Sequence, residues 1–275
     1  MIDAHHHLWK YNVQDYDWMN DDRLQGLRRD FLVHDLAEAA QRSDVRGSIA
    51  VQARQSLTET DWLLNVAAHS SLVKGVVGWV PLCSPDVISS LERFANEPKM
   101  KGVRHVLQDE ADDLFMLRED FNRGVGLLRD FGMVYDILIF ERHLPQTIEF
   151  VDRHPEQVFV LDHIAKPRIK DNQISPWAEQ ISEFGKRENV YCKISGMVTE
   201  ASWSGWSALQ LRPYFDVVLG AFGPRRLMFG SDWPVLTLAA DYTTWVNSFR
   251  TFIADLSPEE QERISSGTAR EIYRL

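Results

Sequence analysis

The chain of 275 residues carries 40 acidic and 30 basic side chains, which gives a formal net charge of −10 at neutral pH, and 44% of its residues are hydrophobic. This composition is typical of a globular protein with enough apolar material for a core, and it argues against disorder. The negative charge disfavours nucleic acid and anionic membranes as partners, so we expect a small-molecule ligand. One domain over residues 1–275 accommodates this length.

The first residues carry no secretory signal. Met1 is followed by Ile-Asp-Ala-His, without a basic region or an apolar segment, and no stretch approaches the roughly 18 apolar residues of a membrane span. We therefore expect a cytoplasmic protein. Cys83 and Cys192 are too few for a disulfide framework and lack metal-site spacing, so we expect both to be buried thiols.

Short β-prone segments alternate with longer amphipathic segments along the chain. The predicted strands are Ile2–His7, Gly47–Gln52, Gly75–Val80, Gly102–Val106, Val134–Ile139, Val158–His163, Val190–Ser195 and Leu227–Ser231. The predicted helices between them are Asp35–Arg42, Glu59–His69, Val87–Asn96, Glu119–Phe131, Leu144–Arg153, Trp177–Arg187 and Leu211–Phe222. Two closing helices, Tyr242–Leu256 and Pro258–Leu275, are predicted after the last strand.

The strand segments read as continuous apolar runs, such as Val-Phe-Val-Leu at 158–161, which is typical of parallel strands covered on both faces. Repeated strand and helix units of this kind predict an α/β fold, a single (β/α)8 TIM-type barrel with extra C-terminal helices. A doubly wound open sheet is the alternative. The sequence, however, lacks both a GxGxxG after its first strand and a P-loop, so a nucleotide-binding sheet is disfavoured.

A barrel enzyme carries its reactive side chains at the C-terminal ends of its strands. His5 and His7 are two residues apart on the first strand, so both should face the barrel interior while His6 faces the helices. A chance cluster or a tag remnant is the alternative, which the position on a strand disfavours. His163 ends the sixth strand, where a structural histidine is the alternative. Asp232 ends the eighth, where a carboxylate without nearby cations would be costly.

Further residues near the strand ends could contact a hydroxylated substrate, which needs fixed donors, acceptors and an aromatic platform. The candidates are Arg54, Trp79, Arg104, His105, Asp136, Lys166 and Trp233. Structural ion pairs are the alternative for the charged members, and rim packing for the tryptophans. The aromatic-rich segments 9–18 and 203–206 could wall a binding cup, although the chain's 9 tryptophans could also serve a homo-oligomer interface.

Several motifs in order resemble the amidohydrolase superfamily: Asp-x-His-x-His at 3–7, Leu-Asp-His at 161–163 and Gly-Ser-Asp-Trp-Pro at 230–234. Lys-Gly-Val-Arg-His at 101–105 and Cys-Lys-x-Ser-Gly at 192–196 resemble its sugar-lactonase branch, and the likeness covers essentially the full chain. The resemblance implies a carboxylic ester hydrolase of carbohydrate metabolism acting on a sugar lactone. No carbamylated-lysine pattern stands on the fourth strand, so two bridged metals are not expected.

Lactone hydrolysis requires an activated water, a polarised carbonyl and a proton for the departing alkoxide. We expect Asp232 to take the proton from water and return it to the leaving oxygen. His5, His7 and His163 would polarise the carbonyl, either directly or by holding, with Asp232, one divalent cation, for which zinc is the first choice. The resemblance covers both metal-using and metal-independent lactonases, so a cation need not be essential.

Two other functions stay open on the same barrel. The first is a metal-dependent decarboxylase, or a hydrolase of another small carboxylic acid, because one fold hosts many chemistries. The second is a carbohydrate-binding barrel without turnover. A comparison of acid release with CO2 release separates the enzymatic alternatives.

Overall fold

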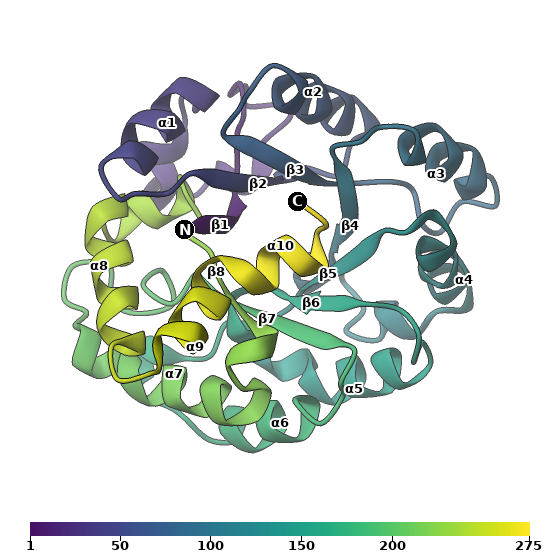
Figure 1. Ribbon diagram of the computed structural model, residues 1–275. Coiled ribbons are helices and arrows are strands. Elements are labelled where there is room, and N and C mark those ends of the chain that lie inside the picture. The colour runs from purple at the N-terminus through teal and green to yellow at the C-terminus, as the bar shows by residue number, and fades with distance from the viewer.

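The computed structural model describes residues 1–275 as a ring of parallel strands in the order β1 to β8, surrounded by helices (Figure 1). The strands are β1 Ile2–His6, β2 Gly47–Val51, β3 Val73–Gly78, β4 Met100–Val106, β5 Val134–Leu138, β6 Phe159–Leu161, β7 Val190–Ile194 and β8 Leu227–Phe229. Every consecutive pair from β1 and β2 to β7 and β8 is parallel. The predicted TIM-type barrel is confirmed.

Eight helices lie outside the barrel, one after each strand. They are α1 Val33–Gln41, α2 Leu57–Ala68, α3 Val87–Ala95, α4 Glu119–Leu127, α5 Leu144–Asp152, α6 Trp177–Phe184, α7 Ala208–Phe222 and α8 Tyr242–Ile253. The closing segment is helical from Pro258 to Ile272, as predicted, with a π-helical stretch Arg263–Gly267 that joins α9 Pro258–Glu262 to α10 Thr268–Ile272. No helix is both long and apolar enough to cross a membrane.

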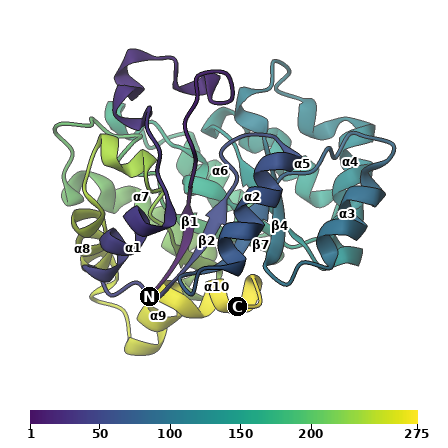
Figure 2. The same cartoon turned by 90° about the horizontal axis from the view of Figure 1, so that it is seen from above.

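The helices α9 and α10 lie across the end of the barrel where the strands begin (Figure 2). Ala269 and Tyr273 from this region join a cluster of 10 buried apolar residues, whose other members come from β1, β2, β3, β5, β6 and β8. Because opposite strands contribute to it, this cluster lies inside the barrel and fills its N-terminal end. A larger cluster of 64 buried residues packs the strands against the outer helices. The barrel is therefore plugged at one end and open to polar groups only at the other.

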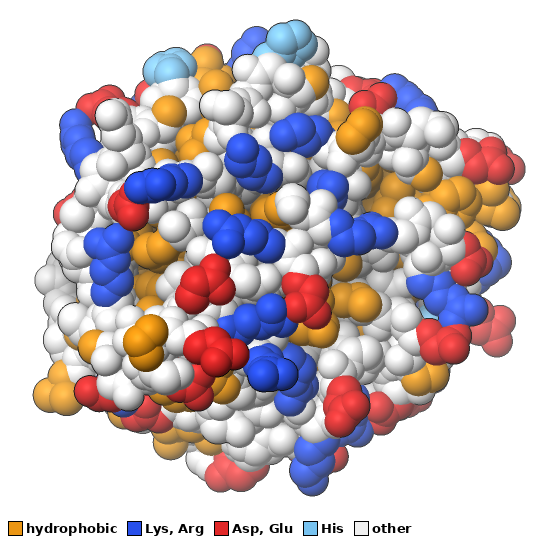
Figure 3. All heavy atoms as spheres, viewed as in Figure 1, with side chains coloured by type: hydrophobic (Ala, Val, Ile, Leu, Met, Phe, Trp, Pro, Cys, Tyr) orange, Lys and Arg blue, Asp and Glu red, His pale blue; other side chains and the backbone are white.

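The surface over the plugged end carries many charges. Lysine and arginine side chains gather around the centre of this face, with acidic side chains between them, and apolar atoms are scattered (Figure 3).

Of the two cysteines, Cys192 is buried as expected, whereas Cys83 is half-buried, so the expectation of a buried thiol is wrong for Cys83.

The seam between β1 and β8 is closed by a buried carboxylate. Asp3 is fully buried and accepts hydrogen bonds from Ser231 N at 2.8 Å, Ser231 Oγ at 2.6 Å and the Tyr242 hydroxyl at 2.8 Å. The backbone N–H of His5 donates to the same carboxylate at 3.1 Å. Backbone bonds from Asp232 N to His5 O, at 2.8 Å, and from His7 N to Trp233 O extend the seam. One side chain thus fixes the first strand against the segment after the last.

Replacing Asp3 by alanine should lower the free energy of unfolding by about 3–5 kcal/mol, because several buried donors lose their acceptor together. Tyr242→Phe removes a single donor and should cost about 1 kcal/mol. Urea unfolding measures both values. Asp255→Ala, at an exposed carboxylate, is the control. Equal stability of Asp3→Ala and wild type would show that the hydrogen bonds to Asp3 do not hold β1 against the segment after β8.

Candidate active site

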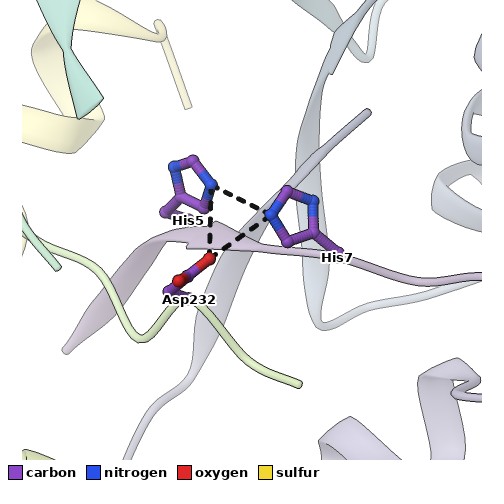
Figure 4. A group of neighbouring side chains, drawn as sticks. All are labelled: His5, His7 and Asp232. Atoms are coloured by element: carbon purple, nitrogen blue, oxygen red, sulfur yellow. Dashed lines mark hydrogen bonds and ion pairs between the residues drawn. The ribbon is translucent and has the colours of Figure 1, made fainter. Parts of the chain in front are cut away.

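Three imidazoles and one carboxylate converge at the C-terminal end of the barrel. His5 lies on β1, His7 directly follows it, and Asp232 follows β8 and points between them (Figure 4). His5 Nε2 lies 3.2 Å from His7 Nε2, and Asp232 Oδ1 lies 3.4 Å from His7 Nε2 and 3.8 Å from His5 Nε2. His163, just after β6, brings its Nε2 within 3.8 Å of the same carboxylate oxygen. The structure therefore brings together the four residues predicted from the sequence.

The outer nitrogen of each imidazole is held by a neighbour. His7 Nδ1 lies 2.8 Å from the carbonyl oxygen of Val51, which can only accept, so Nδ1 carries the proton and Nε2 presents a lone pair. His163 Nδ1 lies 2.8 Å from Ser195 Oγ, and His5 Nδ1 lies 3.2 Å from Asp162 Oδ1. These contacts fix the ring orientations, as partners behind metal-ligating histidines do.

The donor set fits one divalent cation. Nitrogen and oxygen ligands bound at about 2.0–2.1 Å in a tetrahedron lie about 3.3 Å from one another. The separations of 3.2, 3.4 and 3.8 Å among His5, His7 and Asp232 are close to this edge length. His5 Nε2 and His7 Nε2 lie 3.2 Å apart, and at least one of them presents a lone pair to the space between them. A cation bound to both nitrogens would stabilise this close approach. The cluster of His5, His7 and Asp232, with His163 beside it, could hold a metal ion.

Burial and nearby charges set the protonation of the cluster. Burial lowers the pKa of His5 well below its ordinary value and that of His163 to about 4, so both rings are neutral at pH 7. Burial alone would raise the pKa of Asp232, but His163, His7 and Lys166 outweigh it, and the pKa lies below the ordinary value. The ionised carboxylate of Asp232 thus faces the neutral imidazoles of His5 and His163.

A chain of buried charges lies beneath the cluster. Asp162 Oδ2 accepts from Arg104 Nη1 at 3.0 Å, and Lys193 Nζ lies 2.9 Å from Asp162 Oδ1. Lys193 also forms an ion pair with Asp136, which accepts at 2.9 Å from the hydroxyl of Tyr273. Burial alone would raise the pKa of Asp162, but Lys193, His5 and Arg104 hold it well below its usual range. Because two cations already neutralise Asp162, a second metal with His5 and His163 is disfavoured.

The backbone around the site adopts unusual conformations. His163, Ile164, Ala165 and Lys166 have positive φ angles in succession, and Asp232 has φ +59°. Non-glycine residues in this region store strain that the surrounding fold must support, and such residues cluster at functional sites. These departures end β6 at Leu161 and β8 at Phe229, so both strands are shorter than predicted.

A cavity of about 730 Å³ opens above the cluster. Arg54, Arg104 and Lys166 line it, so these three predicted substrate contacts face the same space as His7, His163 and Asp232. Arg54 also forms an ion pair with Asp15 across the mouth. The other lining residues are Gln14, Asp15, Asp17, Trp18, Ala53, Gln55, Ser56, Val106, Gln108, Asp109, Glu110, Leu138 and Val235.

Four predicted substrate contacts do not line the cavity. Asp136 is fully buried below the cluster, where Lys193 and Tyr273 satisfy its carboxylate. The ring of Trp233 packs edge-on against Phe31 at 5.4 Å. The remaining two, Trp79 and His105, sit behind the cavity wall and bond to each other. The structure does not bring these four side chains to the cavity, because a position near a strand end does not fix the direction of the side chain.

Part of the cavity wall was predicted from the sequence. Gln14, Asp15, Asp17 and Trp18 line the cavity from the aromatic-rich segment 9–18, whereas no residue of 203–206 does. Sequence reasoning did not assign Gln108, Asp109 or Glu110 to the site, although all three line the cavity from the segment after β4. The available signal was length, because the segment 107–118 between β4 and α4 is longer than the few residues that usually join a strand to its helix.

A TIM-type barrel that gathers three histidines and a carboxylate at the C-terminal ends of its strands defines a hydrolase of the kind that activates water at such a cluster. The sequence model of the family described as Amidohydrolase matches residues 2–275. The chain belongs to this family, as its motifs predict.

Individual relatives agree along the whole chain. The L-fucono-1,5-lactonase of Burkholderia multivorans is 39% identical, with 100% of this chain and 96% of that protein covered. The L-fucono-1,5-lactonase of Burkholderia ambifaria is 36% identical, with 100% and 95% covered. A crystal structure of an amidohydrolase from Burkholderia multivorans with bound zinc matches at a TM-score of 0.96 and 38% identity, with 100% of this chain and 99% of that chain covered. The similarity therefore covers every strand that carries a residue of the cluster.

The position of His163 depends on the absence of a side chain at Gly196. A Cβ there would lie 2.8 Å from Cβ, Cγ and Nδ1 of His163, and Gly196 has φ +67°. Gly196→Ala should therefore displace the imidazole and lower kcat/KM at least about 10-fold, because small misplacements of reacting groups are costly. Gly220→Ala, in α7 with no atom within 4 Å of the new Cβ, is the matched control. Unchanged kcat/KM in a folded Gly196→Ala protein would contradict this role.

Proposed function

We propose that this chain is a cytoplasmic lactonase that hydrolyses a sugar-acid lactone, L-fucono-1,5-lactone or a related aldonolactone, to the open-chain aldonate. This places it in sugar degradation, with L-fucose as the first candidate. The observation that carries the proposal is the convergence of His5, His7, His163 and Asp232 beside a polar cavity that the last three of them line, in a chain related over its full length to two L-fucono-1,5-lactonases.

The cavity suits a polyhydroxylated ligand. Only 5 of its 19 lining residues are hydrophobic. Arg54 Nε, Arg104 Nε and Gln108 Oε1 are buried and have no hydrogen-bond partner within the protein. Buried polar atoms of this kind are costly unless a partner reaches them. The hydroxyls and ring oxygen of a sugar lactone supply both donors and acceptors.

Asp232 acts as the base in the proposed reaction. Its ionised carboxylate takes a proton from water as the water oxygen bonds to the lactone carbonyl carbon. When the bond from that carbon to the ring oxygen breaks, Asp232 returns the proton to the ring oxygen, which leaves as a hydroxyl. The new carboxylic acid then ionises to the aldonate. The depressed pKa of Asp232 keeps it in the base form before each turnover.

The histidines have two alternative roles, as direct donors to the carbonyl oxygen or as metal ligands. In neutral His7 the proton is on Nδ1, so Nε2 cannot donate and can only bind a cation or accept. This supports the ligand role, with His5, His7, His163 and Asp232 holding one ion, zinc in our proposal. Such an ion would polarise a carbonyl and make bound water more acidic.

Lys166 supplies a positive charge beside the reacting groups. It lines the cavity, and no carboxylate lies within ion-pair distance of its Nζ. Its charge is among those that lower the pKa of Asp232. We assign Lys166 to the developing negative charge on the substrate's carbonyl oxygen and then to the product carboxylate, because fixed cations of this kind stabilise such charge.

Purified protein should release acid from L-fucono-1,5-lactone when a panel of L- and D-aldonolactones is followed with a pH indicator. Asp232→Asn should keep the fold and lower kcat at least about 100-fold, the scale of losing a general base. Asp255→Asn, at an exposed position, serves as the control. CO2 release from small carboxylic acids without lactone turnover would support the decarboxylase alternative. Near-normal kcat in Asp232→Asn would remove Asp232 from its role.

Removal of the metal should lower turnover if the ligand role is correct. Exhaustive chelation, with metal content measured on the same sample, should reduce kcat/KM, and stoichiometric zinc should restore it. Metal binding itself has a separate readout, because a ligand that binds only the folded state raises the unfolding temperature. Full turnover by protein that contains no metal would eliminate the Lewis-acid role and leave the histidines as direct contacts.

A further inference from the structure

Glu110 presents a carboxylate to the cavity from the segment that follows β4. Its side chain is 26% exposed and lines the cavity wall. Oε1 lies 2.6 Å from His105 Nε2, whereas Oε2 has no donor within the protein. One carboxylate oxygen is therefore anchored, and the other is free to accept a hydrogen bond from a ligand.

His105 holds Glu110 from behind the wall. Its ring stacks on Phe115 at 5.0 Å and 9°, and meets Phe121 edge-on at 5.5 Å, so its plane is fixed on two sides. The indole N–H of Trp79 lies 3.4 Å from His105 Nδ1 and can only donate. The proton of the neutral imidazole must then be on Nε2, where it is donated to Glu110.

The protonation of His105 agrees with this direction. Burial lowers the pKa of His105, and the hydrogen bond to Glu110 only partly offsets that effect, so the ring carries one proton at neutral pH. The donors therefore run one way, from Trp79 to His105 to Glu110. At the end of this series lies the carboxylate of Glu110, an acceptor whose orientation is fixed by His105.

We infer that Glu110 is a specificity-determining residue that accepts a hydrogen bond from a ring hydroxyl of the lactone, with His105 and Trp79 as positioning residues. This inference rests on the proposed function. An ionised carboxylate accepts hydrogen bonds and repels anions, so the subsite selects a hydroxyl group and rejects a substrate that carries a carboxylate at that place. Asp109, also on the wall, reinforces the rejection of anions.

A purely structural ion pair between His105 and Glu110 is the competing explanation. Such a pair would affect stability and would lower activity on all lactones alike. A hydroxyl subsite has a different signature, because removing either partner of one hydrogen bond affects only the substrates that make it. The selectivity between lactones, rather than the activity on one lactone, therefore distinguishes the two explanations.

The test compares wild type with Glu110→Gln on L-fucono-1,5-lactone and on analogues that each lack one ring hydroxyl. Loss of a charge-assisted hydrogen bond should lower kcat/KM on the full lactone about 10-fold or more, mainly through KM. Activity on one deoxy analogue should stay nearly unchanged. Glu119→Gln, an exposed glutamate at the start of α4 without a side-chain partner, is the matched control and should behave as wild type.

The variants His105→Phe and Trp79→Phe keep the ring packing and remove the anchor. They should shift selectivity in the same direction as Glu110→Gln, by less, because the carboxylate remains but is no longer oriented. Ratios of kcat/KM between two lactones do not depend on the folded fraction, so the test holds even for a destabilised variant. An equal loss on every analogue, or unchanged ratios, overturns the inference. No lactone turnover by wild type overturns the proposed function and this inference with it.

Discussion

The geometry of the site depends on the hydrogen bonds that join Asp3 to Ser231 and Tyr242, in the segment after β8. A parallel barrel must bring its first and last strands together, and here a fully buried carboxylate with donors from Ser231 and Tyr242 does so. The same seam carries His5 and His7 on one side and Asp232 on the other. The separations of 3.2–3.8 Å within the cluster therefore depend on how tightly this seam is closed.

Polarity changes in steps along the barrel axis. Apolar side chains and Tyr273 fill the end where the strands begin, and the buried charges of Asp136, Lys193 and Asp162 come next. The imidazole of His5 contacts Asp162 through Nδ1 and His7 through Nε2, so it joins the buried charges to the cluster above them. Each buried charge has an opposite partner, which is the condition under which ions persist in a low-dielectric interior. The result is a rigid base that fixes the histidine above it.

The sequence predicted the barrel because buried parallel strands leave long apolar runs, as at 158–161, and because strands and helices alternate regularly. It predicted His5, His7, His163 and Asp232 because reactive residues collect at strand ends in this fold. It did not separate His105 from Arg104, although neighbouring residues on a strand point to opposite faces, and only Arg104 lines the cavity. Nor could it place Asp136, whose partners Lys193 and Tyr273 come from distant parts of the chain. It predicted segment 9–18 as a wall without naming the individual members, such as Asp15, that line the cavity. It did not find Glu110, which reaches the cavity from an irregular segment without periodicity.

The order of synthesis gives the hydrogen bonds between Asp3 and Ser231 a further consequence. The residues that meet there, Asp3 and Ser231, are 228 positions apart, so His5 and His7 leave the ribosome long before the strand that completes their surroundings. Until then β1 has a free edge, and the nascent barrel is an open sheet that other chains could pair with. Because contacts between residues so far apart in sequence form late, the unpaired edge of β1 stays exposed to aggregation until the last strand is made.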